Sequence, residues 1–90
     1  MKKHFEIQVY GRVQGVGFRY NARNRARSLN LNGYVENRPD GSVRTAVEGE
    51  EKDCRKYIRW CREGPGYSWV EKIEVEEKEP EGFGSFHVRY

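Results

Sequence analysis

Apolar residues occupy every second position of the segment HFEIQVY, residues 4–10, as Phe5, Ile7 and Val9. The residues between them are polar. Successive side chains of an extended chain point to opposite faces, so this alternation predicts a strand with one buried face. The first ten residues include two lysines but no long apolar run, which is typical of a strand and not of a signal peptide.

The apolar period changes after the glycine-rich stretch that follows this strand. Apolar side chains then recur every three or four residues, at Phe18, Ala22, Ala26 and Leu29. This spacing predicts an amphipathic helix over residues 18–29. Arg23, Arg27 and Ser28 fall on the opposite side of the predicted helix, and we expect that side to face solvent.

The segment GYVENRPDGSVRTAVEG, residues 33–49, predicts a β-hairpin. Its strands are expected over residues 33–36 and 42–48. The turn between them is Pro39-Asp40-Gly41, whose residue types favour tight turns.

A second helix is predicted after Gly49 and ends at the GPG of residues 64–66. Its apolar positions stand three or four residues apart, at Cys54, Tyr57, Ile58 and Cys61. Two cysteines seven residues apart on one helix lie roughly 10 Å apart, which is too far for a disulfide. We expect two buried thiols, in preference to a metal or redox pair.

Two further strands are predicted over residues 69–79 and 85–90. The spacing of Trp69, Val70 and Ile73 is irregular, so we expect a bend or bulge there. The order of elements predicts an α+β fold: a ferredoxin-like βαββαβ sandwich with an added C-terminal strand. Its sheet is expected to be mostly antiparallel, with two helices on one face. This plan hosts many functions, so it does not identify one.

Composition limits the class of protein. Ninety residues suit a single domain, 1–90, and the 13% of aromatic residues provide large side chains for its core, so disorder is not expected. No apolar run approaches the roughly 20 residues that span a bilayer. We expect a cytoplasmic monomer that does not associate with membranes.

Charge is distributed unevenly along the chain, whose net charge is +3. Five arginines and no acidic residue or lysine lie between Gly11 and Asn30. Six glutamates lie between Glu71 and Glu81. The basic segment favours an anionic ligand, and the acidic segment argues against a surface that binds nucleic acid.

The basic segment begins with GRVQGVGFR, residues 11–19, which lies between the first strand and the first helix. Glycine adopts positive φ at little cost, so successive amides of such a loop can converge on an anion. The helix N-terminus adds unpaired amides, and Arg19 offers a planar fork that matches two phosphate oxygens. The stretch matches neither of the common nucleotide-binding glycine motifs. A tight turn that needs glycine only for packing is the alternative.

GRVQGVGFR and, at hairpin distance, GYVENRPDGSV resemble the acylphosphatase family, and VEG at residues 47–49 and FHVRY at 86–90 continue the likeness. The resemblance covers nearly the whole chain. It implies hydrolysis of the carboxyl–phosphate bond of small-molecule acyl phosphates without a metal or other cofactor. Inorganic phosphate is then both the product and a competitive ligand.

The resemblance also implies which residues act. The catalytic residues are Arg19 and Asn37. The phosphate-binding residues are those of the loop, Gly15, Val16, Gly17 and Phe18. Asn30 stands where this family usually has glycine at the end of the first helix, and asparagine tolerates the left-handed conformation better than most residues.

Residue chemistry is consistent with these roles. A carboxylate leaves easily, so the main tasks are to hold the phosphoryl group, neutralise its charge and aim a water. The loop amides and Arg19 suit the first two tasks. The side chain of Asn37 can accept from a water and donate, but it is no strong base. Our hypothesis is that the bound phosphate takes the proton of that water; an ordinary turn asparagine is the alternative.

Two other functions compete with this interpretation. RNA-recognition modules share the βαββαβ plan, and GVGFRY is similar to their aromatic signature. That signature belongs on a central strand, with aromatic rings on the open sheet face, whereas here it precedes a helix. On the first and third predicted strands only Tyr10 could stack a base. The other alternative is an inactive or carbamoyl-phosphate-directed relative, since the same motif occurs as a module of larger enzymes.

Overall fold

The computed structural model describes all 90 residues and contains every predicted element. The strands are β1 (Lys2–Arg12), β2 (Asn32–Asn37), β3 (Val43–Glu50), β4 (Trp69–Lys78) and β5 (Phe86–Arg89). The helices are α1 (Phe18–Ser28) and α2 (Glu51–Glu63). The observed ends lie within about two residues of those that periodicity predicts. Neither helix has the length and apolar character needed to cross a lipid bilayer.

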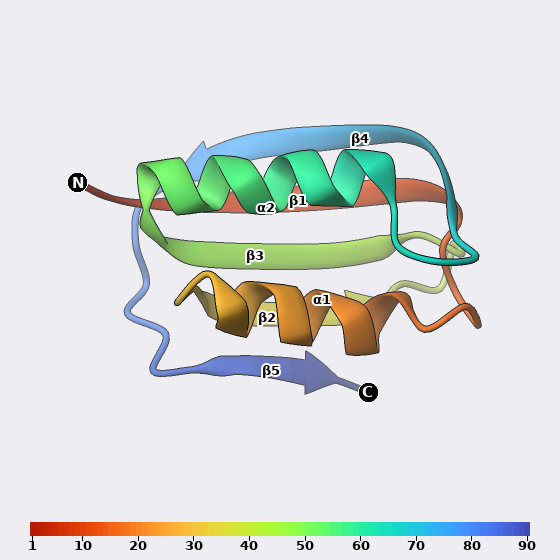
Figure 1. The fold of residues 1–90 in the computed structure, drawn as a ribbon, viewed down its shortest axis with the longest axis horizontal. Coiled ribbons are helices and arrows are strands. Elements are labelled where there is room, and N and C mark those ends of the chain that lie inside the picture. Colours follow the sequence, from red (N-terminus) through yellow and green to blue (C-terminus); the bar gives the residue numbers. More distant parts are fainter.

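The five strands form one sheet in the order β4-β1-β3-β2-β5. β1 pairs antiparallel with β3 and β4, and β2 pairs antiparallel with β3. The added strand β5 is parallel to β2. Both helices cover the same face of the sheet (Figure 1), with α2 packed on β1, β3 and β4 and α1 on β2 and β5. The predicted ferredoxin-like α+β fold is confirmed.

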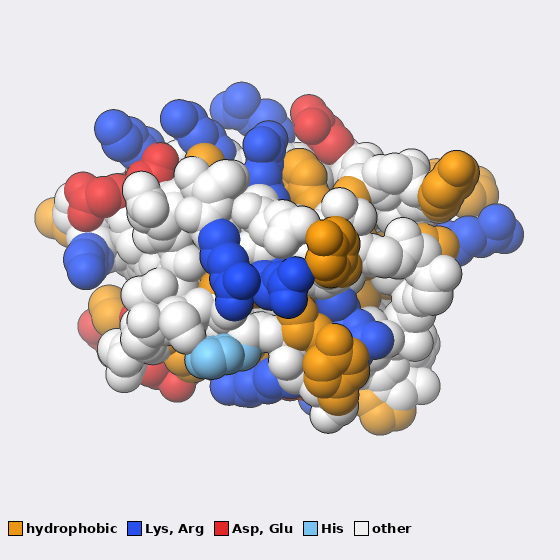
Figure 2. Space-filling view, turned by 60° about the horizontal axis from the view of Figure 1, so that its bottom comes forward, with side chains coloured by type: hydrophobic (Ala, Val, Ile, Leu, Met, Phe, Trp, Pro, Cys, Tyr) orange, Lys and Arg blue, Asp and Glu red, His pale blue; other side chains and the backbone are white.

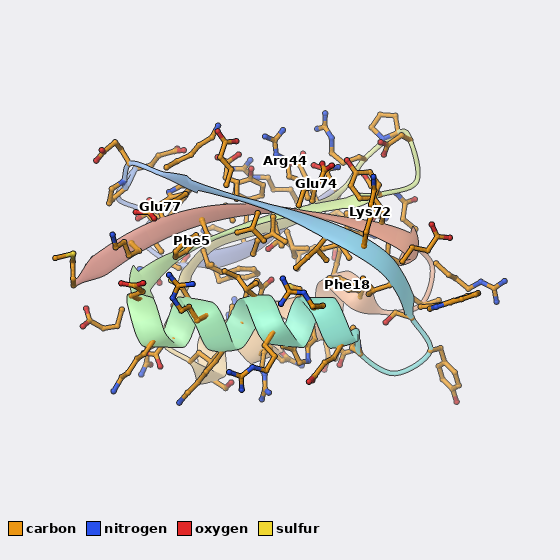
Figure 3. The ribbon with its side chains drawn as sticks, turned by 90° about the horizontal axis from the view of Figure 1, so that it is seen from above. Phe5, Phe18, Arg44, Lys72, Glu74 and Glu77 are labelled. Carbon is orange, nitrogen blue, oxygen red and sulfur yellow. The ribbon has the colours of Figure 1, made fainter.

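The core lies between the sheet and the two helices. Alternate residues of β1 face it, and the apolar faces of α1 and α2 close it, so Phe5 and Phe18 both lie in this layer (Figure 3). The buried hydroxyl of Thr45 is 2.8 Å from the Tyr57 hydroxyl and donates to the carbonyl of Tyr34. These two buried hydroxyls are thus paired, which avoids the cost of about 1–3 kcal/mol for an unsatisfied one.

The two cysteines and the tryptophan of α2 all lie on or beside the core side of the helix. Cys54 and Cys61 are buried and unbridged, as predicted. Burial raises the pKa of the Cys54 thiol to about 11 and that of Cys61 still further, so both stay protonated. Trp60 packs between the helices, with its ring 5.5 Å from that of Phe18 and 5.7 Å from that of Tyr57.

Two irregular backbone features fall where the sequence predicted them. Tyr10 pairs with Lys72 but Gly11 pairs with Val70, so Glu71 is the extra residue of a bulge in β4. Bulges bend the strands that contain them. Asn30 adopts φ 58°, the left-handed conformation at the end of α1. The amide of Leu31 then donates to the carbonyl of Ala26 and closes the helix.

The segment between β4 and β5 must cross from one edge of the sheet to the other. Glu48 of β3 holds it, because its carboxylate accepts hydrogen bonds from the amides of Glu81, Gly82 and Phe83. The same carboxylate lies 2.7 Å from Nδ1 of the buried His4. This anchor fixes where β5 begins, and β5 reaches the side of α1.

His4, Glu6 and Glu81 each place one potential metal ligand within 4.8 Å of the others. Glu6, however, forms ion pairs with Arg44 at 2.9 Å and with Lys78 at 3.6 Å. These cations compete with any metal for the carboxylate. We interpret the cluster as a charge-balanced network that joins the strands, on the sheet face opposite the helices where Figure 3 shows Arg44.

Replacing the anchor tests its contribution to stability. Burial raises the pKa of the Glu48 carboxyl, but the hydrogen bonds from the crossing amides and His4 outweigh burial, and the net pKa lies below its ordinary value of 4.5. A carboxyl with a lowered pKa stabilises the fold above the unfolded-state pKa, and this stabilisation is lost as pH falls through the folded-state pKa. We expect Glu48→Gln to lower the free energy of unfolding at pH 7 by about 2 kcal/mol.

Urea unfolding at several pH values between about 3 and 7 measures this effect. The variant should lose less stability than the wild type on acidification, because its side chain no longer titrates. Glu50→Gln, at an exposed neighbouring position, is the control. Equal stability and equal pH dependence of Glu48→Gln and wild type would contradict the anchoring role.

Candidate active site

One pocket of about 170 Å³ lies where the glycine loop, the N-terminal half of α1, the end of β2 and the end of the chain converge. Its lining residues are Val13, Gly15, Gly17, Phe18, Arg19, Tyr20, Arg23, Asn37, Val88 and Tyr90. It therefore brings together five of the six residues that the sequence predicted for a site. The sixth, Val16, is not among the lining residues, because its side chain packs against the core.

The loop presents its amides without partners. Gly15 and Gly17 have φ of 73° and 79°, and any other residue in this left-handed conformation would cost about 1–2 kcal/mol. Gly17 is the N-cap of α1, and the first amide to find a backbone acceptor is that of Asn21, which donates to the Gly17 carbonyl. Amides from Gly15 to Tyr20 donate to no group of the protein. With the positive end of the helix dipole beside them, these amides have the chemistry that suits an anionic ligand.

The guanidinium of Arg19 is held at the pocket by the last residues of the chain. Its Nη1 donates to the carbonyl of Arg89 at 3.3 Å, and its Cζ lies 4.8 Å from the centre of the Tyr90 ring. It has no acidic partner, since the side-chain ion pairs of arginine belong to Arg38, Arg44, Arg55 and Arg89. The charge of Arg19 is thus available to a ligand.

Asn37 is the last residue of β2 and pairs with Val43 across the hairpin. Its side-chain oxygen Oδ1 is buried and accepts no hydrogen bond from the protein. Leaving such an atom unpaired costs about 1–3 kcal/mol, and unpaired buried acceptors are rare outside functional sites. The position of this oxygen in the lining of the pocket favours a role in holding a ligand or a water.

Gln14 fixes the distance between the loop and the hairpin. Its Nε2 donates to the carbonyl of Arg38 at 2.8 Å and to that of Ser42 at 2.9 Å, the two residues that flank the turn. The turn itself is closed by the Asp40 carboxylate, which accepts from the amide and hydroxyl of Ser42. These hydrogen bonds hold the pKa of Asp40 below its usual value. Gln14 therefore positions Asn37 relative to the glycine-rich loop.

The predicted position of Arg23 was wrong. The helical period assigned it to the solvent side of α1, but it lines the pocket and is only partly exposed. The reason is β5, which lies beside α1, so that Val88 and Tyr90 line the pocket together with Arg23. The spacing of Arg19 and Arg23, one helical turn apart, was the signal that could have placed them on one face. Figure 2 shows Lys and Arg side chains gathered near the middle of the face formed by α1 and β5, beside hydrophobic side chains.

The sequence and the fold both match known proteins. A family model described as Acylphosphatase matches residues 5–88. An acylphosphatase of Geotalea uraniireducens is 45% identical over 91 residues, which cover 100% of both chains. The crystal structure of acylphosphatase from Bacillus subtilis superposes with a TM-score of 0.94 at 38% identity, again over 100% of both chains.

A segment of a larger protein is also similar. The structure of full-length HypF in its phosphate- and nucleotide-bound form matches with a TM-score of 0.89 at 34% identity, and the match covers 12% of that chain. Because the family model spans nearly the whole sequence and a full-length relative shares almost half of it, this chain belongs to the acylphosphatase family of hydrolases.

Proposed function

We propose that this enzyme hydrolyses acyl phosphates with Arg19 and the loop amides holding the phosphoryl group and Asn37 orienting the attacking water. The observation that carries the proposal is that three kinds of polar group without partners lie at the same pocket. Unpaired amides, a cation without an acidic partner and a buried amide oxygen without a donor all line one pocket. Each needs a partner, and a phosphoryl group with its attacking water supplies all three.

Binding of the phosphoryl group rests on the donors at the N-terminus of α1. Each charge-assisted hydrogen bond contributes about 1.5–3 kcal/mol, so several that converge on one group hold it firmly. Arg19 adds a forked donor pair that neutralises charge on two oxygens. Its contact with the Arg89 carbonyl, at 3.3 Å, is long for a hydrogen bond and is easily exchanged for a phosphate oxygen.

The reaction joins the water oxygen to phosphorus and breaks the bond between phosphorus and the acyl oxygen. The electron pair of the broken bond leaves with the carboxylate, which needs no proton. One proton of the water passes to an oxygen of the bound phosphoryl group, because the pocket lining contains no acidic or imidazole side chain to accept it. The products are a carboxylate and inorganic phosphate, and the latter competes with substrate for the same donors.

Asn37 acts on the water. Its Oδ1 accepts one hydrogen bond from the water and thereby directs a lone pair of the water oxygen toward phosphorus, in line with the leaving group. Gln14 keeps this oxygen at a fixed distance from the loop through its bonds to Arg38 and Ser42. In this proposal Gln14 is a positioning residue.

A metal is not part of the proposal. The lining residues contain no aspartate, glutamate, histidine or cysteine, so the pocket lacks the side chains that hold Mg²⁺ or Zn²⁺.

RNA recognition also receives little support, because Tyr10 donates its hydroxyl to Glu74 and the neighbouring open face of the sheet carries Glu6 and Glu76. Carboxylates repel a phosphate backbone.

The test of the proposed function is phosphate release from acetyl phosphate and benzoyl phosphate, with and without EDTA. We expect hydrolysis of both substrates at rates that EDTA does not change. Loss of activity on adding EDTA, with recovery on adding a divalent metal, would contradict the mechanism. Absence of hydrolysis would contradict the activity itself.

Arg19→Ala should lower kcat/KM for benzoyl phosphate by at least about 1,000-fold, because one charge-assisted fork is lost from the site where charge develops. It should also remove competitive inhibition by inorganic phosphate. Arg19→Lys, which keeps the charge without the fork, should recover only part of the activity. Arg25→Ala, an exposed position on the same helix, is the control. Full activity in Arg19→Ala would refute the assigned role.

Asn37→Ala should separate catalysis from binding. The water loses its acceptor, so kcat should fall by about 100-fold or more, while the donors that bind phosphate remain. The inhibition constant of inorganic phosphate should therefore stay within about threefold of the wild-type value. Steady-state kinetics with phosphate as inhibitor give both quantities. A loss of phosphate binding that matched the loss of kcat would show that Asn37 binds rather than orients.

A further inference from the structure

The pocket contains a second arginine that the proposed mechanism does not use. Arg23 follows Arg19 by four residues, so its Cα lies about 6 Å further along α1. It lines the same pocket, whose other wall is formed by Val88 and Tyr90. The phosphoryl group is anchored at the N-terminus of the helix. Arg23 therefore lies further along α1 from this end, and we take the acyl group of the substrate to extend toward it.

The guanidinium of Arg23 is held in position by an aromatic ring, but no acidic side chain neutralises its charge. Its Cζ lies 5.0 Å from the centre of the Tyr20 ring, a cation–π contact that holds the group in position. It has no acidic partner, since the side-chain ion pairs of arginine are those of Arg38, Arg44, Arg55 and Arg89. Its Nε is buried and donates no hydrogen bond. A buried donor on a permanent cation without an acceptor favours an anionic ligand.

Arg27, one turn further along, shows the contrast. Its Nη2 donates to the carbonyl of Phe86, so this arginine serves to attach β5 to α1. Arg25 is exposed and lies outside the pocket. Of the three arginines that follow Arg19 on α1, only Arg23 combines a place in the pocket with an unpaired buried donor.

We infer that Arg23 forms a second anion-binding subsite, which selects acyl phosphates whose acyl group carries a further negative charge. This inference rests on the proposed function. The spacing of about 6 Å between the two arginines along the helix suits an acyl chain with a terminal anion separated from the carbonyl carbon by two carbon atoms. The monophosphate of a four-carbon dicarboxylic acid has this form. Val88 contacts the apolar part of such a chain.

The experiment compares two substrates that differ only at the far end. Fumaryl monophosphate carries a terminal carboxylate, and crotonyl phosphate has a methyl group in its place. Both have a rigid trans double bond, which prevents the carboxylate from attacking its own anhydride. The measured quantity is the ratio of kcat/KM for the fumaryl compound to that for the crotonyl compound, in wild type, Arg23→Gln, Arg23→Lys and Arg25→Gln.

We expect the wild type to favour the fumaryl compound and Arg23→Gln to lower the ratio by about tenfold or more, because a charge-assisted fork to the carboxylate is lost. Arg23→Lys should give an intermediate ratio. Arg25→Gln removes the same charge from the same helix and should leave the ratio unchanged. Thermal unfolding of Arg23→Gln verifies that the variant is folded.

Three results would overturn the inference. A wild type that does not discriminate between the two substrates has no such subsite. An equal loss on both substrates in Arg23→Gln would mean that Arg23 serves the phosphoryl group or the fold. An equal change of the ratio in Arg25→Gln would mean that the substrate preference comes from the overall positive charge of α1 and not from a contact with Arg23. Failure of the proposed function would be distinguishable from failure of this inference, because the wild type would then hydrolyse neither compound.

Discussion

The candidate site depends on a set of hydrogen-bond donors that the fold leaves without acceptors. Amides from Gly15 to Tyr20 and the guanidinium of Arg19 meet at one pocket, where no acidic side chain neutralises them. Unpaired donors at a helix end are ordinary, because an α-helix cannot satisfy its own first amides. Here the left-handed glycines before the helix add further amides, and the arginine adds a fixed charge. We propose that a tetrahedral anion supplies the missing acceptors.

The rest of the molecule keeps this set of donors in place. Gln14 ties the loop to the hairpin that carries Asn37. β5 runs beside α1, and its Arg89 carbonyl receives the Arg19 guanidinium. β5 is itself held by the contact of Arg89 with the Tyr34 ring, at 3.7 Å, and by the ion pair of Arg89 with Glu36. The Glu48 anchor fixes the crossing segment that brings β5 there, so a carboxylate distant from the pocket supports the geometry of the pocket.

Every helix and strand was predicted from the sequence: β1 and the two helices from their apolar periods, and the β2–β3 hairpin from its turn residues. The irregular apolar spacing predicted the bulge near Glu71, and the left-handed Asn30 was expected from the family resemblance, in which glycine usually occupies that position. Arg19 and Asn37 were recognised by motif; both line one pocket, and their catalytic roles stay a prediction. The crossing segment held by Glu48 was not foreseen, because its hydrogen bonds join residues more than 30 positions apart. The role of Gln14 was also not foreseen, because its hydrogen bonds join residues 24 and 28 positions apart. Arg23 was assigned to solvent because a helical period does not reveal which strand will cover a given side.

The most direct measurement of the central claim is a titration of the ¹⁵N-labelled protein with inorganic phosphate, followed through its amide NMR signals. If the unpaired amides bind the anion, the largest changes fall on residues 15–20, with smaller ones at the Asn37 side chain, and they saturate at one phosphate per chain. Changes spread over the basic surface of α1, or no saturable change in the loop, would contradict the account.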